Sequence, residues 1–296
     1  MNQAINPYRP DPDLKIWMDG ELVPTSEARI SVFDHGLLYG DGCFEGIRIY
    51  NGKIFKEAEH IRRFFQSAKV IRLDLPLSPD GVSAAMKEAV VANEIEGDGY
   101  IRLLATRGVG SLGISPKHTA NPSVIIIAAT IQLYPPELYE TGLRCITSSY
   151  IRTNPNSLSP RVKSLNYLNN ILAKLEALDA GANEAIMLNH EGHVAEATGD
   201  NLFIIRDREL QTPPASSGIL EGITRRVVID LAASAGYTVV EKTLIRHDLY
   251  VADEVFLTGT AAEIISVVAV DRRQVGDGRP GPITRQLLEL FIAARS

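Results

Sequence analysis

The feature that most constrains the fold is a pair of two-residue turns, each of which separates two strand-like runs. Asp19-Gly20 lies between KIWM and ELVP, and Asn51-Gly52 lies between EGIRIY and KIFK. Such pairs tolerate the positive φ of a type I′ turn, so both turns predict antiparallel hairpins. Helical periodicity then covers two stretches, about 58–72 and 79–95, and the strand-like runs YIRLLATR and SVIIIAAT follow. This part of the chain is therefore predicted to be an α+β unit.

Beyond residue 142 the pattern becomes a mixture of helices and strands. Periodicity predicts helices at about 164–180, 222–235 and 281–294. The strand-like runs of this part are EAIMLN, HVAEAT, NLFIIR, YTVVEK and EVFLTG. Pro135 and Pro136 interrupt the pattern in QLYPPELYETG, which is typical of a linker. We therefore predict a small domain over 1–131, a linker over 132–142 and a large domain over 143–296, with ligands bound in the cleft between the two domains.

Composition excludes several kinds of partner. The chain has 296 residues and a formal net charge of −6, so we expect no general attraction to nucleic acid or anionic membranes. Cys43 and Cys145 lack CxxC spacing and suit a reducing compartment. The N-terminus lacks the pattern of a signal peptide, and the longest apolar run, VIIIAA, is too short to span a bilayer. These features predict a cytoplasmic protein.

Motifs of other enzyme classes are incomplete or missing. Gly108, Gly110 and Gly113 fit GxGxxG after a strand, but Pro116 and Pro122 follow and no helical period appears. A dinucleotide site needs a helix at that point, so we expect a flexible loop instead. The six histidines show no HExxH spacing, which leaves a metal site without support, and no GxSxG elbow occurs.

A lysine stands where the helix predicted over 164–180 should begin. Apolar residues at intervals of three and four define that helix, namely Leu165, Leu168, Leu172 and Leu175. A protonated amine is unfavourable at a helix N-terminus, because the exposed N–H groups there carry partial positive charge. Lys163 therefore either points into water or is a neutral amine that is ready to form a Schiff base. The lysine alone leaves both interpretations open.

Other stretches carry candidate ligands for charged groups. LEGITRR places Ile223 and Thr224 in the first turn of a predicted helix, where free N–H groups and a hydroxyl could hold a phosphate. LTGTAAE offers a second set of backbone donors at a strand end. Glu196, between two alanines, either faces solvent or is buried against a cation. Arg63 is either a solvated helix charge or a phosphate ligand, and Arg62 is an equally available neighbour.

In combination these stretches resemble the class IV pyridoxal-phosphate-dependent aminotransferases, in particular the short, archaeal-like branched-chain amino acid aminotransferases. The matching motifs are FDHGLLYGDGCFEGIR, EHIRRFFQSAK, YIRLLATRGVG, KSLNYLNN, EATGDNLF, LEGITR and LTGTAAE, which span the chain from about residue 15 to 290. The resemblance implies a fold type IV enzyme with a smaller N-terminal α/β sandwich, a larger C-terminal pseudo-barrel domain and pyridoxal phosphate between them. It also implies amino transfer between leucine, isoleucine or valine and 2-oxoglutarate, in a homodimer or higher homo-oligomer.

The resemblance further implies roles for individual residues. Lys163 would carry the cofactor and act as general base and acid, Tyr167 would bind the ring O3′, and Glu196 would pair with the pyridine nitrogen. Five residues would hold the phosphate: Arg63, Ile223, Thr224, Gly259 and Thr260. Eight would contact the substrate: Tyr39, Phe44, Gly46, Tyr100, Arg102, Val109, Thr260 and Ala261. Arg102 would receive the distal carboxylate of glutamate, and Val109 would reach the partner subunit's pocket.

Rival interpretations share the same fold. A D-amino acid aminotransferase resembles the chain in FDHGLLYGDG, but its usual Arg-x-His pair after YIRLLATR is absent here. An aminodeoxychorismate lyase would release pyruvate without any amino acceptor. A non-catalytic binding protein is a third alternative, which the presence of Lys163 and Glu196 disfavours. Tyr134 is expected to substitute for the Trp-containing linker of larger bacterial relatives.

Overall fold

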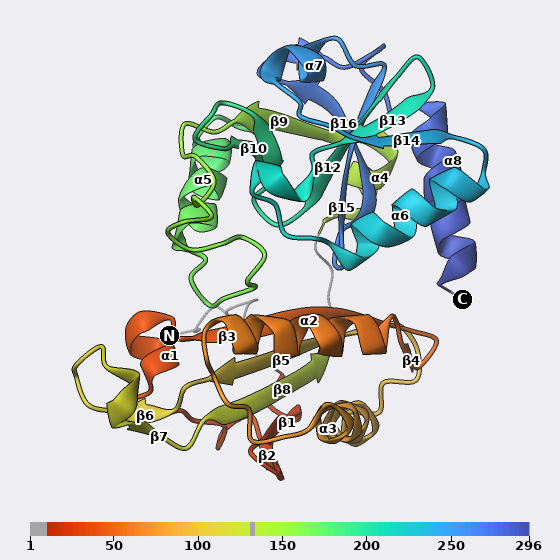
Figure 1. The fold of residues 1–296 in the computed structure, drawn as a ribbon. Helices are drawn as coiled ribbons and strands as arrows, with labels where there is room; N and C mark the ends of the chain where they lie inside the picture. Colours follow the sequence, from red (N-terminus) through yellow and green to blue (C-terminus); the bar gives the residue numbers. More distant parts are fainter. Residues whose placement is uncertain (1–10, 131–133, 296) are drawn as a thin grey trace, which may run out of the picture. The chain divides into compact units, whose positions relative to one another are not determined.

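The structure is a computed structural model that describes residues 11–130 and 134–295. The chain divides into two compact units, Met1–Ile131 and Gln132–Ser296, which we call unit 1 and unit 2. Each unit combines helices with a β-sheet, so the predicted α+β class is confirmed (Figure 1). None of the helices in the described ranges has the length and hydrophobicity that a membrane span requires.

Unit 1 is built on a six-stranded sheet of order β2-β1-β8-β5-β3-β4, in which each neighbouring pair is antiparallel. Its strands are β1 (Lys15–Met18), β2 (Glu21–Pro24), β3 (Gly42–Tyr50), β4 (Lys53–Ile54), β5 (Gly99–Thr106) and β8 (Ser123–Ala129). The hairpins β1–β2 and β3–β4 form its two edges. All four turn residues, Asp19, Gly20, Asn51 and Gly52, have positive φ, which confirms both predicted turns.

Two helices, α2 (Glu57–Val70) and α3 (Pro79–Ala92), cover one face of this sheet (Figure 1). Phe64 of α2 and Met86 of α3 share a core with Ile101 and Leu103 of β5. Alternate strand positions therefore face the helices, and the positions between them face the other way.

A short helix and a small hairpin form a separate module within unit 1. Its elements are α1 (His35–Tyr39), β6 (Val109–Gly110), the 3₁₀ helix Pro116–His118 and β7 (Thr119–Ala120). The His35 N–H donates to the Gly108 carbonyl at 2.9 Å, which ties the helix to the hairpin. No α-helix follows Gly113 within the described residues up to β8, so this GxGxxG is not a dinucleotide fingerprint.

Unit 2 is built on a nine-stranded mixed sheet of order β11-β10-β9-β16-β15-β12-β13-β14, with β17 paired to β16. Its strands are β9 (Leu143–Thr147), β10 (Glu184–Leu188), β11 (Val194–Ala197), β12 (Asn201–Arg206), β13 (Glu209–Thr212), β14 (Thr238–Glu241), β15 (Glu254–Gly259), β16 (Glu263–Val270) and β17 (Arg273–Gln274). β9 is parallel to β10 and β16, β13 is parallel to β14, and the other pairs are antiparallel.

The helices of unit 2 are α4 (Pro136–Thr141), α5 (Leu168–Asp179), α6 (Ile223–Ser234), α7 (Arg246–Tyr250) and α8 (Pro282–Ala294), with a 3₁₀ helix at Ala215–Ser217. Helices α6 and α8 lie side by side, and α5 lies against β10 (Figure 1).

Part of the predicted linker is the helix α4 of unit 2. Leu138 and Tyr139 of this helix pack against the main core of the unit. Pro135 and Pro136 occupy its N-cap and first position, where a backbone N–H has no helical partner, so they start the helix. Tyr134 is buried in the same core and its hydroxyl donates to Glu184 at 3.2 Å. Residues 131–133 lie outside the described part.

The helix predicted over 164–180 begins at Leu168, and its alanines, not its leucines, pack against the sheet. It starts at Leu168, so the segment that contains Lys163 is not helical. Ala173 and Ala177 pack in a small core with β10, whereas Leu168 is 65% exposed and Leu175 is 50% exposed. The leucine spacing thus predicted the helix, and small residues meet the sheet because they allow a closer helix–sheet approach than leucines would.

Candidate active site

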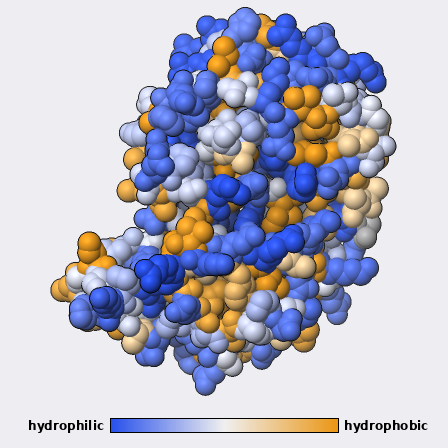
Figure 2. Space-filling view, viewed as in Figure 1, coloured by the Kyte–Doolittle hydropathy of each residue, from blue (hydrophilic) through white to orange (hydrophobic). Residues whose placement is uncertain are grey.

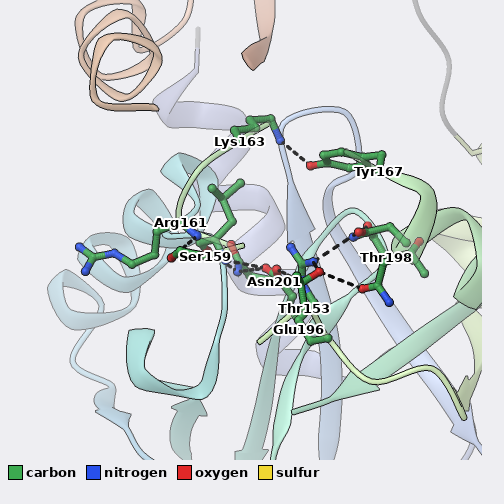
Figure 3. Close-up of polar contacts among 12 residues, drawn as sticks. Thr153, Ser159, Arg161, Lys163, Tyr167, Glu196, Thr198 and Asn201 are labelled. Carbon is green, nitrogen blue, oxygen red and sulfur yellow. Dashed lines mark hydrogen bonds and ion pairs between the residues drawn. The ribbon is translucent and has the colours of Figure 1, made fainter. Parts of the chain in front are cut away.

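The Lys163 side chain lies next to the Tyr167 side chain in unit 2. The Lys163 Nζ donates to the Tyr167 hydroxyl at 3.2 Å (Figure 3). Lys163 precedes α5, and Tyr167 is the N-cap residue of that helix. Lys163 therefore lies before the helix and not in its first turn, and its amine contacts the phenol of the N-cap residue.

The segment around Lys163 is fixed by its neighbours. Val162 and Ser164 are buried, and the Ser164 N–H donates to the Val162 carbonyl at 2.8 Å. The Tyr167 N–H donates to the Leu165 carbonyl at 3.0 Å. These two short turns constrain the backbone at Lys163 and just after it.

Glu196 of β11 is buried against a cation that sequence reasoning missed. Its Oε1 accepts from the Arg152 Nε at 2.8 Å, and the two side chains are only 7% and 9% exposed. The solvent-facing interpretation of Glu196 is therefore wrong. Burial raises the pKa of Glu196, and the charge of Arg152 opposes that effect.

The second oxygen of Glu196 is bound from two further directions. Its Oε2 accepts from the Asn201 Nδ2 at 3.0 Å and from the Leu220 N–H at 3.0 Å (Figure 3). Asn201 also donates to the Leu220 carbonyl at 2.8 Å. The carboxylate is therefore fixed to the loop that leads into α6.

Helix α6 presents an N-terminus without a side-chain cap among the described residues. Gly222 is the N-cap residue, and Ile223 and Thr224 begin the helix, as predicted from LEGITR. A Cβ on Gly222 would lie 2.0 Å from the Asn201 Oδ1, so only glycine fits there. Uncapped amides at the start of a helix are suited to bind a phosphate.

The turn after β15 contains the second predicted set of anion ligands. β15 ends at Gly259, and Thr260 and Ala261 form the turn to β16. A Cβ on Gly259 would lie 1.9 Å from the Asp200 Oδ1, so this turn packs tightly on Asp200. Burial, with a smaller contribution from the charge of Glu184, raises the pKa of Asp200 to about 7.

Four predicted substrate residues lie together on one face of the unit 1 sheet. Gly46 is opposite Arg102 in the register of β3 and β5, so both lie on the face that the helices do not cover. The Arg102 guanidinium lies 4.6 Å from the Phe44 ring centroid and 5.7 Å from the Tyr100 ring centroid. A Cβ on Gly46 would lie 2.0 Å from the Tyr100 hydroxyl, so glycine makes room for the phenol.

Arg63 of α2 lies apart from this group. It donates through Nε and Nη2 to the Glu45 carboxylate at 2.8 and 2.7 Å, and His60 contacts the same carboxylate at 2.8 Å. Glu45 alternates with Phe44 and Gly46, so it belongs to the helix-covered face of the sheet. Arg62, the competing candidate, is exposed.

Tyr39 and Val109 belong to the module of α1 and the β6–β7 hairpin. The Tyr39 hydroxyl donates to the Leu112 carbonyl, and Val109 bridges to Asp34. Val109 is 44% exposed. The structure thus places these two predicted substrate residues in one local assembly of unit 1.

Comparison with known proteins shows what this arrangement is similar to. A model of the family "Amino-transferase class IV" matches residues 42–270. The chain belongs to the class IV aminotransferases. A putative branched-chain-amino-acid aminotransferase of Methanocaldococcus jannaschii is 49% identical over 283 residues, which cover 96% of this chain and 97% of that protein. The branched-chain-amino-acid aminotransferase of Escherichia coli K12 is 39% identical, over 94% of this chain and 91% of that protein.

Solved structures are similar along the same length. A branched-chain amino acid aminotransferase from T.th. with pyridoxamine 5′-phosphate has a TM-score of 0.91 and 42% identity, over 95% of this chain and 94% of that chain. The Escherichia coli enzyme has a TM-score of 0.93 and 38% identity, over 96% and 95%. This class IV aminotransferase therefore depends on pyridoxal phosphate and has the fold type IV architecture, as the motifs predicted.

The unit 2 residues of this aminotransferase fit pyridoxal phosphate. The cofactor carries its reactive carbon and its ring hydroxyl on neighbouring ring atoms, and Lys163 and Tyr167 offer an amine and a phenol 3.2 Å apart. It carries a ring nitrogen at one end and a phosphate at the other, and Asn201 joins a buried carboxylate to the uncapped start of α6. The donor set thus matches each polar group of the cofactor.

Proposed function

We propose that this aminotransferase transfers the amino group between the branched-chain L-amino acids leucine, isoleucine and valine and 2-oxoglutarate. The observation that carries the proposal is the contact of Arg102 with the aromatic ring of Phe44, 4.6 Å from guanidinium to ring centroid. This contact combines an aromatic surface with a cation. The names of the M. jannaschii and Escherichia coli relatives support the same substrate class.

The two substrates make opposite demands on one pocket. A branched aliphatic side chain needs apolar contacts, whereas burying the distal carboxylate of glutamate without a partner costs several kcal/mol. Arg102 is half-buried and stacked on Phe44, so its outer edge can pair with a carboxylate. Tyr100 and Gly46 would line the same pocket, and Thr260 and Ala261 would bind the α-carboxylate through the turn after β15.

In the proposed chemistry Lys163 binds the cofactor and moves the proton. Once the amino group of the substrate has displaced it from the cofactor, the free Nζ would take the proton from the substrate Cα and deliver it to C4′ of the cofactor, since a neutral amine is a base of suitable strength. Bound pyridoxal phosphate supplies an electron sink for this step. Tyr167 orients the cofactor ring and Glu196 pairs with its nitrogen. The phosphate would be held by Ile223, Thr224, Gly259, Thr260 and Arg63.

We further propose that two copies of the chain form a homodimer. Large apolar side chains of the α1–hairpin module are exposed, namely Val32 (68%), Phe33 (47%), Leu37 (57%), Leu112 (69%) and Ile114 (84%). Figure 2 shows apolar residues at the outer end of the β6–β7 hairpin. Monomeric proteins rarely leave such a patch open, so a second copy of the chain is its proposed occupant. The family resemblance assigns Val109 of the same module to the partner subunit's pocket.

A cytoplasmic location is part of the same proposal. Both cysteines, Cys43 and Cys145, are free and buried, which is the usual state of cysteines in a reducing compartment.

The test is a panel of amino donors with 2-oxoglutarate as acceptor. We expect turnover with L-leucine, L-isoleucine and L-valine and none with their D forms. Faster turnover of D-alanine than of L-leucine would identify a D-amino acid aminotransferase. Release of pyruvate from aminodeoxychorismate without acceptor would identify the lyase, and either result would overturn the proposal.

A further inference from the structure

A buried arginine, Arg152, binds the carboxylate that is proposed to face the cofactor's ring nitrogen. The Arg152 Nε lies 2.8 Å from the Glu196 Oε1, and neither side chain is more than 9% exposed. The resemblance to known aminotransferases assigned a role to Glu196 but none to Arg152. Because both side chains are almost completely shielded from solvent, their charges interact strongly, and removal of one partner leaves the other charge uncompensated.

Arg152 is held in place by groups other than Glu196. Its backbone N–H donates to the Leu188 carbonyl at 2.7 Å, and its Nη1 lies 3.3 Å from the Asn170 Oδ1. The Asn170 Nδ2 in turn donates to the Thr198 carbonyl at 2.7 Å. Asn170 lies on the buried face of α5, so this helix positions the guanidinium, while the end of β10 fixes the Arg152 backbone and the loop after β11 fixes Asn170.

Glu196 is fixed equally well, by donors on both of its oxygens. Arg152 binds Oε1, while Asn201 and the Leu220 N–H bind Oε2. These three donors together orient the carboxylate. A carboxylate held in this way is pre-organised to receive a proton donor such as a ring N–H⁺.

A buried carboxylate and a pyridine nitrogen share one proton in two possible ways. The proton lies either on the nitrogen, which gives an ion pair, or on the carboxyl group, which gives two neutral partners. Burial favours the neutral form, and accordingly it raises the pKa of Glu196. A permanent positive charge in contact with the carboxylate stabilises the carboxylate anion and therefore favours the ion pair.

We propose that Arg152 is a positioning residue that keeps Glu196 ionised and thereby keeps the proton on the ring nitrogen of bound pyridoxal phosphate. This inference rests on the proposed role of Glu196. It gives Arg152 a specific task, because a protonated ring nitrogen is what makes the cofactor an effective electron sink. Asn170 does not bind Glu196 itself; it orients the Arg152 guanidinium that does.

The experiment measures the protonation of the ring nitrogen directly. Holoenzyme is prepared with pyridoxal phosphate labelled with ¹⁵N, and the nitrogen chemical shift reports its protonation. We expect a protonated signal in the parent, a shift toward the unprotonated position in Arg152→Met, and recovery of most of the shift in Arg152→Lys, which restores the charge. Arg225→Met is the matched control, because Arg225 is another buried arginine but pairs with Glu241 at 2.9 Å.

Two further variants separate this role from a structural one. Combined with Glu196→Gln, the Arg152→Met substitution should no longer move the nitrogen signal, because its effect passes through the carboxylate. Asn170→Ala should shift the signal in the same direction as Arg152→Met but less, and it keeps the test available if Arg152→Met does not fold. An unchanged nitrogen signal in folded Arg152→Met or in Asn170→Ala would overturn the inference. Failure of the parent to bind the cofactor would instead overturn the proposed function.

Discussion

The Lys163 amine and the Tyr167 hydroxyl are 3.2 Å apart, in a loop that ends where α5 begins. The two side chains are four positions apart in the sequence, but no helix holds them together. Their contact depends on the turn that the Tyr167 N–H closes with the Leu165 carbonyl. The amine that we propose to react is therefore placed by loop geometry, and its partner hydroxyl lies on the side that we propose for the ring oxygen of the cofactor.

Lys163→Ala should abolish steady-state turnover while the fold survives, because the amine that removes the Cα proton is gone. The measurement is the rate of leucine conversion, together with borohydride reduction and mapping of the labelled lysine. Lys242→Ala, at an exposed lysine of unit 2, is the control and should behave like the parent. Labelling of another lysine in the parent would rule out the assignment.

Glu196→Gln should slow proton removal from leucine by roughly tenfold or more, which corresponds to about 1.4 kcal/mol. The amide keeps the shape of the side chain but cannot balance a positive ring nitrogen. Stopped-flow measurement of a single half-reaction would show the loss, whereas cofactor affinity should change less. Equal rates in parent and variant would mean that Glu196 pairs with Arg152 but has no role in proton removal.

Arg102→Leu should lower kcat/KM for glutamate and 2-oxoglutarate roughly tenfold to a thousandfold, the effect of losing about 1.4 to 4 kcal/mol of charge-assisted contact. Leucine should be affected far less, because an aliphatic side chain makes no use of the charge. Separate stopped-flow traces for the two half-reactions provide the test. Arg62→Leu, at an exposed arginine of the same unit, is the control. Equal losses for both donors would make Arg102 structural.

The double substitution Leu112→Glu with Ile114→Glu should weaken self-association, because it places two charges on the exposed apolar patch of the hairpin. Sedimentation velocity at several protein concentrations would measure the change. Val91→Glu alters an equally exposed apolar residue (77%) of α3 and should leave assembly unchanged. A dimer that withstands the double substitution would place the interface elsewhere.

Glu45 gives unit 1 a defined dependence on pH. Burial alone would raise its pKa, but the charge and hydrogen bonds of Arg63, with those of His60, lower it from 4.5 to about 2. The folded chain thus binds this proton less tightly than the unfolded chain, so the stabilisation is complete above pH 4.5 and is lost as the pH falls toward 2. Glu45→Gln should lower the free energy of unfolding at pH 7 by about 3 kcal/mol and flatten its pH dependence below 4.5.

Urea titrations between pH 3 and 7 would measure this effect, with Glu96→Gln as an exposed carboxylate control from the same unit. If Glu45→Gln and the parent lost stability in parallel on acidification, the acid sensitivity would have to come from other carboxylates.

Local patterns predicted the parts of the fold that local physics controls. Both two-residue turns were correct because Asp19 and Asn51 adopt the positive φ that their glycine neighbours favour. The helix start predicted in LEGITR was also correct: Gly222 is the N-cap residue and Ile223 begins the helix. The family motifs identified the enzyme class because they combine seven such local stretches in one order.

Long-range contacts account for what the sequence could not predict. Arg152 and Glu196 are 44 positions apart, and nothing near Arg152 in the sequence marks it as a buried cation. The outward leucines of α5 have a helical period, but period alone does not tell which face meets the sheet; Ala173 and Ala177 decide that by allowing close packing. The unforeseen features are therefore those in which a distant strand determines the environment of a residue.

Asn201 gives the site a fixed length. One side-chain amide holds the Glu196 carboxylate at 3.0 Å and the Leu220 carbonyl at 2.8 Å, two residues before the N-cap of α6. The groups proposed for the two ends of the cofactor are thus joined by a rigid spacer. A spacer of fixed length selects ligands by the distance between their charged groups. An analogue of pyridoxal phosphate with the correct charges but a longer phosphate arm would therefore pair with only one of the two sets of residues.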